Sequence, residues 1–285
     1  AVARNDRVLV YGGAGTGKSL LLVETAKQEA DAGRSVLVTF RSPRLAELFE
    51  PHLISHPVDV IPFGELGTSR QYDVVLVDEA QDLMTAGAMD LLDAVVAGGR
   101  AGGRWRMFLD PNNQAHVDGD YDDEVRALVA EDAIEVDLTV NVRNTRSIVH
   151  VVQEYLAADV GDPGVVHGEK VRWHNVDTGP AVEDALRVAK ALVADGADPE
   201  GIWVIPPDLS DPAEPVDGIR VAGPRDVKGL EADHVVVCGL PKVLDSRGVS
   251  SLYVAVTRAR VSLDIVLSKE ERRRLTDLVR DGRSR

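Results

Sequence analysis

The sequence predicts an α/β protein of two domains, each a mostly parallel β-sheet with helices on both faces. Its length is the first observation behind this prediction, since 285 residues correspond to about two domains of roughly 150 residues each. The second observation is that short apolar runs alternate with helix-like stretches, which is typical of parallel sheets covered by helices. We expect residues 1–135 to form the first domain and residues 136–285 the second.

Eight apolar runs are expected to be buried parallel strands. Most are rich in β-branched residues and bounded by Gly, Pro or Asp, as strands buried on both faces tend to be. The runs are Val8–Tyr11, Val36–Phe40, Val58–Ile61, Val74–Val77, Met107–Leu109, Ile202–Ile205, Val235–Cys238 and Leu263–Leu267.

Helix-like stretches lie between these runs. Two of them end close to Gly33 and Gly98, which are plausible helix stops, and others carry apolar residues at three- and four-residue spacing. The expected helices are Lys18–Ala32, Leu83–Val96, the short Val125–Ala130, Thr145–Ala158 and Val182–Asp195. The Pro- and Asp-rich residues 206–218 are expected to form an exposed loop, and the tail from Lys269 a solvated final helix.

The composition is that of a globular protein with a strong and uneven negative charge. The 32 basic and 47 acidic residues give 32 − 47 = −15. Residues 1–137 contribute 12 − 24 = −12, and residues 138–285 contribute 20 − 23 = −3. Because phosphate binding needs clustered Lys and Arg, this balance argues against a histone-like coat for nucleic acid. A groove for a polyanion should therefore draw on the second half or on the cleft between the halves.

Other function classes are disfavoured by what the sequence lacks. The single cysteine, Cys238, excludes a disulfide framework and a Cys-rich metal site, and a reducing, cytoplasmic setting fits. No apolar run approaches ~18 residues and no signal peptide is visible, so no membrane association is expected. His52 and His56 are four residues apart, but Pro51 and Pro57 predict a loop there rather than a zinc site.

A phosphate-binding loop is the strongest single motif. Residues 12–19, Gly-Gly-Ala-Gly-Thr-Gly-Lys-Ser, match G-x-x-x-x-G-K-[ST] between a predicted strand and a predicted helix. Glycines let backbone N–H groups surround phosphates, Lys18 can reach the β- and γ-phosphates, and the Ser19 hydroxyl can bind Mg²⁺. The expected nucleotide contacts here are Gly13, Gly15, Gly17, Lys18, Ser19 and Leu20.

An acidic pair follows the predicted strand Val74–Val77. Ligands of open parallel sheets bind at the carboxyl ends of the strands, where Asp78 and Glu79 stand. We expect Asp78 to hold Mg²⁺ and Glu79 to orient or deprotonate the attacking water. Together with the loop, this pair predicts an NTP hydrolase.

Six stretches then follow the pattern of one family, in order along the chain. They are Val38–Ser42, Asp78–Asp82, Phe108–Gln114, Leu138–Thr145, Val227–Asp233 and Tyr253–Arg260. Asp78–Asp82 reads D-E-A-Q-D, and the whole set resembles the boxes of UvrD/Rep-like superfamily 1 DNA helicases.

The resemblance implies two RecA-like P-loop NTPase domains that enclose ATP and Mg²⁺. It implies that Arg143 and Arg258 act as arginine fingers on the γ-phosphate and that Gln114 senses this phosphate. Glu231, with Gly229 beside it, would contact the ribose or stabilise the closed interface. Val142 stands where the family often has a Tyr that stacks on adenine. Only 27 residues separate Ala46 from Val74 and 80 separate Thr145 from Asp226, so the family's large accessory insertions are expected to be missing.

Two functions of different classes remain after the motifs are combined. The leading hypothesis is a minimal helicase-like motor that couples ATP hydrolysis to single-stranded DNA binding and translocation. The alternative is an ATP-gated switch that acts on a fused or bound partner, such as a nuclease-type domain. A small-molecule kinase would leave the second-half boxes unexplained. Oligomeric state stays open.

A few further residues receive expectations by position. Candidate strand contacts are Phe40, Arg41, Phe63 and His116, although Phe40 and Phe63 could equally be core. Cys238 is expected to be a buried thiol. Trp105, Trp173 and Trp203 are expected to be packing residues.

Overall fold

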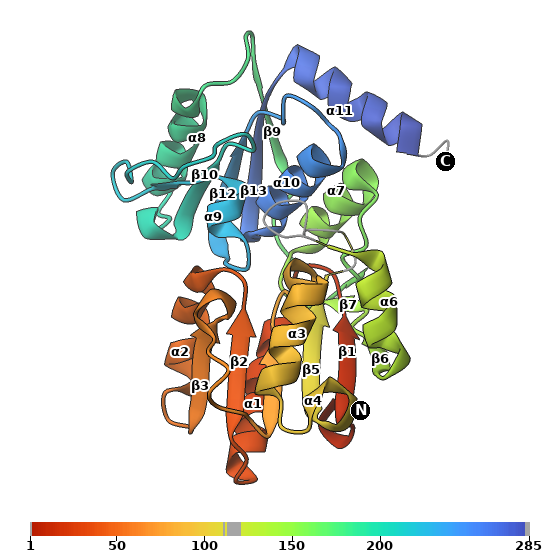
Figure 1. Ribbon diagram of the computed structural model, residues 1–285. Helices are drawn as coiled ribbons and strands as arrows, with labels where there is room; N and C mark the ends of the chain where they lie inside the picture. The colour runs from red at the N-terminus through yellow and green to blue at the C-terminus, as the bar shows by residue number, and fades with distance from the viewer. Residues whose placement is uncertain (1, 111, 113–120, 283–285) are drawn as a thin grey trace. The chain divides into compact units, whose positions relative to one another are not determined.

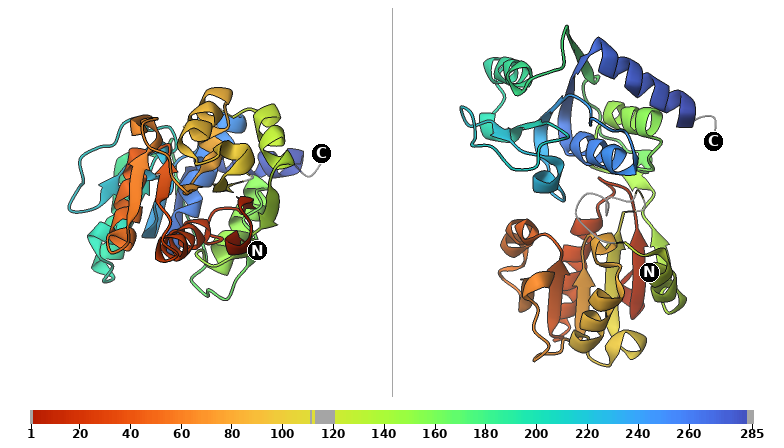
Figure 2. Two further views of the ribbon diagram at one scale, coloured as in Figure 1. Left: turned by 60° about the horizontal axis from the view of Figure 1, so that its bottom comes forward. Right: turned by 45° about the horizontal axis from the view of Figure 1, so that its top comes forward.

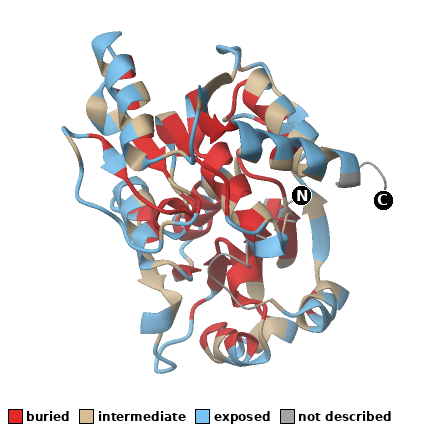
Figure 3. Cartoon of the chain, turned by 90° about the horizontal axis from the view of Figure 1, so that it is seen from above, coloured by how far each residue is buried: buried red, intermediate tan, exposed pale blue. Residues whose placement is uncertain are grey.

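The computed structural model describes residues 2–110, 112 and 121–282. The chain divides into two compact units, residues 1–139 and residues 140–285 (Figure 1). Each unit contains its own parallel sheet, and strands at the centre of each are buried while the outer faces of the helices are exposed (Figure 3). Within the described ranges, no helix is long and apolar enough to cross a membrane.

The first unit is built on a six-stranded sheet in the order β3-β2-β4-β5-β1-β6. All its pairings are parallel. The strands are β1 (Arg7–Tyr11), β2 (Val36–Phe40), β3 (Val58–Pro62), β4 (Val74–Val77), β5 (Arg104–Leu109) and β6 (Ile134–Asp137). Parallel strands place all their carboxyl ends at one edge, so the segments after β1, β4 and β5 can form one site.

Helices cover both faces of this sheet (Figures 1 and 2). One face packs against α1 and α2, and the other against α3 and α6. Thr85 caps α3 by accepting from the Ala88 N–H, and Asp122 caps α6. The helical elements are η1 (Val2–Arg4), α1 (Lys18–Asp31), η2 (Pro43–Leu45), α2 (Ala46–Leu53), η3 (Phe63–Glu65), η4 (Ala80–Leu83), α3 (Ala86–Val95), α4 (Gly99–Gly102) and α6 (Asp123–Glu131).

The second unit contains a five-stranded parallel sheet in the order β11-β10-β12-β13-β9. Its strands are β9 (Arg172–Val176), β10 (Ile202–Ile205), β11 (Arg220–Val221), β12 (Ala232–Cys238) and β13 (Ala259–Ser268), and β7 (Val140–Asn141) pairs separately with β8 (Asp162–Pro163). Its helical elements are α7 (Arg146–Leu156), α8 (Val182–Ala194), η5 (Pro199–Gly201), α9 (Pro224–Val227), α10 (Ser246–Thr257) and α11 (Lys269–Gly282).

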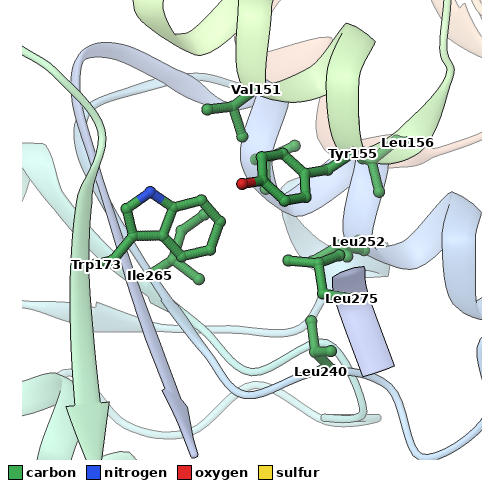
Figure 4. A pocket seen from close by; sticks show the side chains of 9 residues that line it. Val151, Tyr155, Leu156, Trp173, Leu240, Leu252, Ile265 and Leu275 are labelled. Atoms are coloured by element: carbon green, nitrogen blue, oxygen red, sulfur yellow. The ribbon is translucent and has the colours of Figure 1, made fainter. Parts of the chain in front are cut away.

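Helix α8 covers one face of the second sheet, and α7, α10 and α11 pack on the other side. Between these three helices and the sheet lies a small cavity lined wholly by apolar and aromatic side chains (Figure 4). Trp173 packs there against Tyr155, with ring centroids 5.4 Å apart. The cavity belongs to the packing of the second core, because it offers no charged group to a ligand.

Two buried ion-pair clusters stabilise the units. In the first, Glu29 contacts Arg34 at 2.6 Å, Arg104 at 2.7 Å and Arg106 at 2.9 Å. Arg106 is fully buried and also donates to the carbonyl oxygens of Val2 and Asn5. Burial, and then the neighbouring positive charge of Arg104, lower the pKa of Arg106 to about 10.

In the second unit the buried carboxylate belongs to Asp264. Arg172 donates to its two oxygens at 2.8 and 2.9 Å, and His174 Nε2 lies 2.7 Å from Oδ1. Burial raises the pKa of Asp264, but these hydrogen bonds outweigh burial and leave the pKa below its ordinary value.

The predicted fold class is confirmed, and all eight predicted strands are present. The pattern of apolar residues did not predict β6, β7, β8, β9 or β11, nor α2, α4, α9 or α10. The loop expected around His52 is wrong, because His52 lies in α2 with Pro51 inside the same helix. Trp105 and Trp203 are buried, as expected of packing residues.

Candidate nucleotide site

The phosphate-binding loop joins β1 to α1 at the carboxyl edge of the first sheet. Gly15 and Gly17 have φ of 84° and 89°, a left-handed conformation that glycine adopts without strain. A Cβ at Gly12 would lie 2.4 Å from Thr16 Oγ1, so this position has no room for a side chain. The loop ends where α1 begins, at Lys18, and the N-terminus of a helix favours anions.

Lys18 is held directly over this loop. Its Nζ donates to the carbonyl oxygens of Gly12 at 2.7 Å and Gly13 at 3.2 Å, and it lies 3.9 Å from Asp110 Oδ2. The side chain is buried, which places a positive charge in surroundings where it interacts strongly with an anion.

Ser19 and Asp78 bring the loop and the acidic pair together. Ser19 Oγ donates a 2.9 Å hydrogen bond to Asp78 Oδ2, although 59 positions separate the two residues in the sequence. The other oxygen, Asp78 Oδ1, is buried and has no hydrogen-bond partner within the described residues. A buried carboxylate oxygen without a partner is costly, and a cation bound there would satisfy it. A hydroxyl beside a carboxylate is an oxygen donor set that fits Mg²⁺.

The acidic pair lies in strongly perturbed surroundings. Burial, and then the negative charge of Glu79, raise the pKa of Asp78 to about 7. Glu79 has φ of 48°, which is a left-handed conformation and uncommon for a residue with a side chain. Both features are frequent at functional sites.

Gln81 and Asp110 complete this edge of the sheet. Gln81 Nε2 donates a hydrogen bond to Glu79 Oε2, and Gln81 Oε1 accepts from the Asp110 N–H at 3.0 Å. Asp110 directly follows β5, and burial raises the pKa of its carboxyl group. Neither residue was given a role from the sequence, although each lies inside a recognised box.

A second group of predicted residues lies in the second unit. Arg143 Nε contacts Glu231 Oε2 at 2.6 Å, and Arg260 Nη1 lies 3.3 Å from Glu231 Oε1. Gly229 has φ of 78° in the turn that precedes Glu231. The box around Glu231 therefore holds the predicted finger Arg143 by an ion pair.

Arg258 is buried and bonded within its own unit. Its guanidinium donates to Val254 O at 3.0 Å, Leu230 O at 2.9 Å and Thr257 Oγ1 at 3.0 Å. Its exposed fraction of 2% excludes an ordinary surface arginine.

Asn144 links the two arginine segments. Its Nδ2 donates to the carbonyl oxygens of Thr257 at 3.1 Å and Ala259 at 2.7 Å, which flank Arg258. The neighbouring Asn141 accepts from the N–H groups of Arg143 and Asn144. The sequence placed Asn141 and Asn144 in a box but did not predict this network.

The structure thus gathers Gly13, Gly15, Gly17, Lys18, Ser19, Asp78 and Glu79 at one edge of the first unit. Leu20 lies in the first turn of α1 with its side chain 67% exposed, so only its backbone can take part in the loop. Gln114 and His116 lie outside the described residues. Among the residues described, no group of three His, Cys, Asp or Glu side chains forms a metal cluster.

Phe40 was open between strand contact and core, and the structure places it in the core. Phe40 is fully buried and stacks on Phe49 with ring centroids 5.5 Å apart, so it cannot stack on a base. Phe63 is half-buried against the same unit's core, whereas Arg41 is exposed.

Three solved structures with a similar fold are viral helicases. Arterivirus nonstructural protein 10 (helicase) gives a TM-score of 0.58 at 16% identity, covering 97% of this chain and 62% of that chain. The same protein in complex with DNA gives 0.59 at 17% identity, with 98% and 64% covered. PRRSV helicase gives 0.59 at 15% identity, with 97% and 55% covered. No protein-family model and no curated protein matches the sequence.

These likenesses show the fold, two RecA-like α/β units, at identities too low to show more. The chain spans 55% to 64% of the length of these helicases.

Proposed function

We propose that this chain is the minimal motor core of a UvrD/Rep-like superfamily 1 helicase, which hydrolyses ATP and uses the energy to move along single-stranded DNA. The hydrogen bond from Ser19 to Asp78 carries the proposal, because it joins the phosphate-binding loop to the acidic pair. The fold likeness to helicases, one of them in complex with DNA, and the six ordered boxes support it.

Each site residue of the first unit has a role in this proposal. Lys18 and the loop N–H groups of Gly13, Gly15, Gly17 and Leu20 bind the phosphates. Ser19 and Asp78 hold Mg²⁺, which when bound neutralises negative charge on the phosphates. Glu79 orients and deprotonates the attacking water.

The second unit supplies positive charge to the same reaction. Arg143 and Arg258 stabilise the charge that develops on the γ-phosphate, and Glu231 and Gly229 contact the nucleotide. Gln114 senses the γ-phosphate and links it to the DNA-binding surface. Arg143 forms an ion pair with Glu231, so a contact of Arg143 with the γ-phosphate competes with that ion pair.

The test is ATP hydrolysis with and without single-stranded DNA, for the wild type and for Glu79→Gln. We expect DNA to stimulate the wild type, and Glu79→Gln to bind nucleotide but hydrolyse it about 10²–10⁴-fold more slowly. Normal turnover by Glu79→Gln would overturn the assignment of the base. Absence of any DNA stimulation at low salt would overturn the motor.

The ATP-gated switch is the second candidate, because the chain spans less than two thirds of the length of the helicases it resembles in fold. Strand displacement on tailed duplexes of both polarities separates the two functions. Displacement supports the motor, whereas nucleotide-dependent binding of a nuclease-type partner without displacement supports the switch.

A further inference from the structure

The side chain of Gln81 lies between the acidic pair and the end of β5. It is 1% exposed, and both ends of its amide are hydrogen-bonded. Oε1 accepts from the Asp110 N–H at 3.0 Å, and Nε2 donates a hydrogen bond to Glu79 Oε2. The amide therefore bridges the ends of two strands, β4 and β5.

The orientation of this amide follows from hydrogen-bond chemistry. A backbone N–H can only donate, so the atom that faces Asp110 N must be the carbonyl oxygen of Gln81. The amino group then faces Glu79 and donates to its carboxyl oxygen Oε2.

The bridge connects Glu79 with the phosphate-binding loop. Asp110, whose N–H fixes Gln81, lies with its Oδ2 3.9 Å from Lys18 Nζ. Glu79 itself has a left-handed backbone conformation in the turn that follows β4. One chain of contacts thus runs from Lys18 through Asp110 and Gln81 to Glu79.

We propose that Gln81 is a positioning residue, which fixes the direction of the Glu79 carboxylate relative to the phosphate-binding loop. This inference rests on the proposed hydrolysis. It assigns to Gln81 an effect on the rate of the chemical step and none on nucleotide affinity, because Gln81 does not line the loop that binds phosphates.

Two substitutions test the bridge. Gln81→Met keeps the length of the side chain but removes the donor and the acceptor. Gln81→Glu keeps an acceptor for the Asp110 N–H but places an acceptor against Glu79. Because a misplacement of about 1 Å can cost roughly 10²-fold in rate, we expect kcat to fall about 10- to 100-fold in both variants. Gln28→Met, on an exposed position of α1, is the matched control and keeps wild-type kcat.

Two further readouts separate positioning from a merely structural role. The Kd of a fluorescent ATP analogue should stay within about twofold of the wild type, since the loop contacts remain. In a Glu79→Gln background, where the base is gone, Gln81→Met should lower kcat by less than about twofold, because residues that act as one unit are strongly non-additive.

The outcomes distinguish this inference from the proposed function. If the wild type does not hydrolyse ATP, the proposed function fails and the inference fails with it. If the wild type hydrolyses ATP through Glu79 but Gln81→Met and Gln81→Glu keep wild-type kcat, the inference alone is overturned. The same conclusion follows if nucleotide affinity falls as much as kcat. If one variant does not fold, the other decides by the same criteria.

Discussion

The side-chain amide of Asn144 donates a 3.1 Å hydrogen bond to the carbonyl oxygen of Thr257, 113 positions further along the sequence. A second bond from the same nitrogen reaches Ala259 O at 2.7 Å. Because Asn144 directly follows Arg143 and the two carbonyls flank Arg258, one amide fixes both arginine segments relative to each other. An amide nitrogen has two protons to donate, whereas a hydroxyl has one.

Replacing Asn144 should therefore destabilise the second unit. Asn144→Ala leaves two buried carbonyls without this donor, and Asn144→Ser can restore one of them. We expect losses of about 1–3 kcal/mol per unsatisfied group, with Asn144→Ala the less stable variant. Urea unfolding measures the difference. If Asn144→Ala were as stable as the wild type, the amide would not fix these segments.

The ion pair between Arg143 and Glu231 leads to a prediction about hydrolysis. Arg143→Ala should lower kcat by roughly 10³-fold or more, as loss of an arginine finger does in other NTPases. Arg143→Lys should recover little of this, because a lysine lacks the planar fork of donors that matches a phosphate. Steady-state ATP hydrolysis is the measurement, with Arg187→Lys on the exposed face of α8 as control. A kcat for Arg143→Ala close to that of the wild type would show that Arg143 has no part in the reaction.

The Glu29 cluster predicts that substitutions of its members destabilise the protein by different amounts. Glu29→Gln leaves Arg34, Arg104 and the fully buried Arg106 without their common counter-charge, so we expect a loss of about 3–5 kcal/mol. Arg106→Leu should cost less, since Glu29 keeps two arginine partners. Chemical unfolding of both variants tests the order, and the reverse order would contradict it.

Asp264 predicts a pH dependence of stability. Its pKa in the folded state lies below the ordinary value of 3.8, so the charged carboxylate stabilises the folded chain above about pH 4. This contribution is lost as the pH falls through the folded-state pKa. Asp264→Asn should therefore be about 1–3 kcal/mol less stable than the wild type at pH 7, and the gap should narrow below pH 4. Unfolding from pH 7 to pH 3 measures the gap, with exposed Glu200→Gln as control. A constant gap across this range would argue against the ion pair.

Phe40 should behave as a core residue. Its ring is fully buried against Phe49, so Phe40→Ala should cost about 3–5 kcal/mol of stability. The folded fraction of the variant should keep the DNA affinity of the wild type. Thermal unfolding together with a DNA-binding titration checks both statements. A stable variant with weakened DNA binding would restore Phe40 as a strand contact.

The buried central strands could be predicted from the sequence because short apolar runs bounded by Gly, Pro or Asp have few alternatives. Two edge strands, β6 and β9, could not. Ile134–Asp137 contains two acidic residues, and Arg172–Val176 carries Arg, His and Asn, so neither resembles a buried run. Helix α2 was hidden by Pro51, which usually argues against a helix, and α10 begins with small polar residues.

The site could be predicted only where the chemistry is local in the sequence. The loop around Lys18 and the pair Asp78 and Glu79 each form one short motif after one strand. The contacts of Gln81 and Asn144 join segments 29 and 113 positions apart, so only the folded sheet reveals them. For the same reason the sequence could not decide whether Phe40 lies in the core or at the surface.

The backbone conformation at Glu79 favours a different residue from the one that the proposed chemistry needs. At φ of 48° a side chain costs about 1–3 kcal/mol relative to an unstrained conformation. A sequence chosen for the stability of this backbone alone would carry glycine at position 79. Stabilising the protein by redesign would therefore select against its proposed base first, and any search for hyperstable variants should hold this residue fixed.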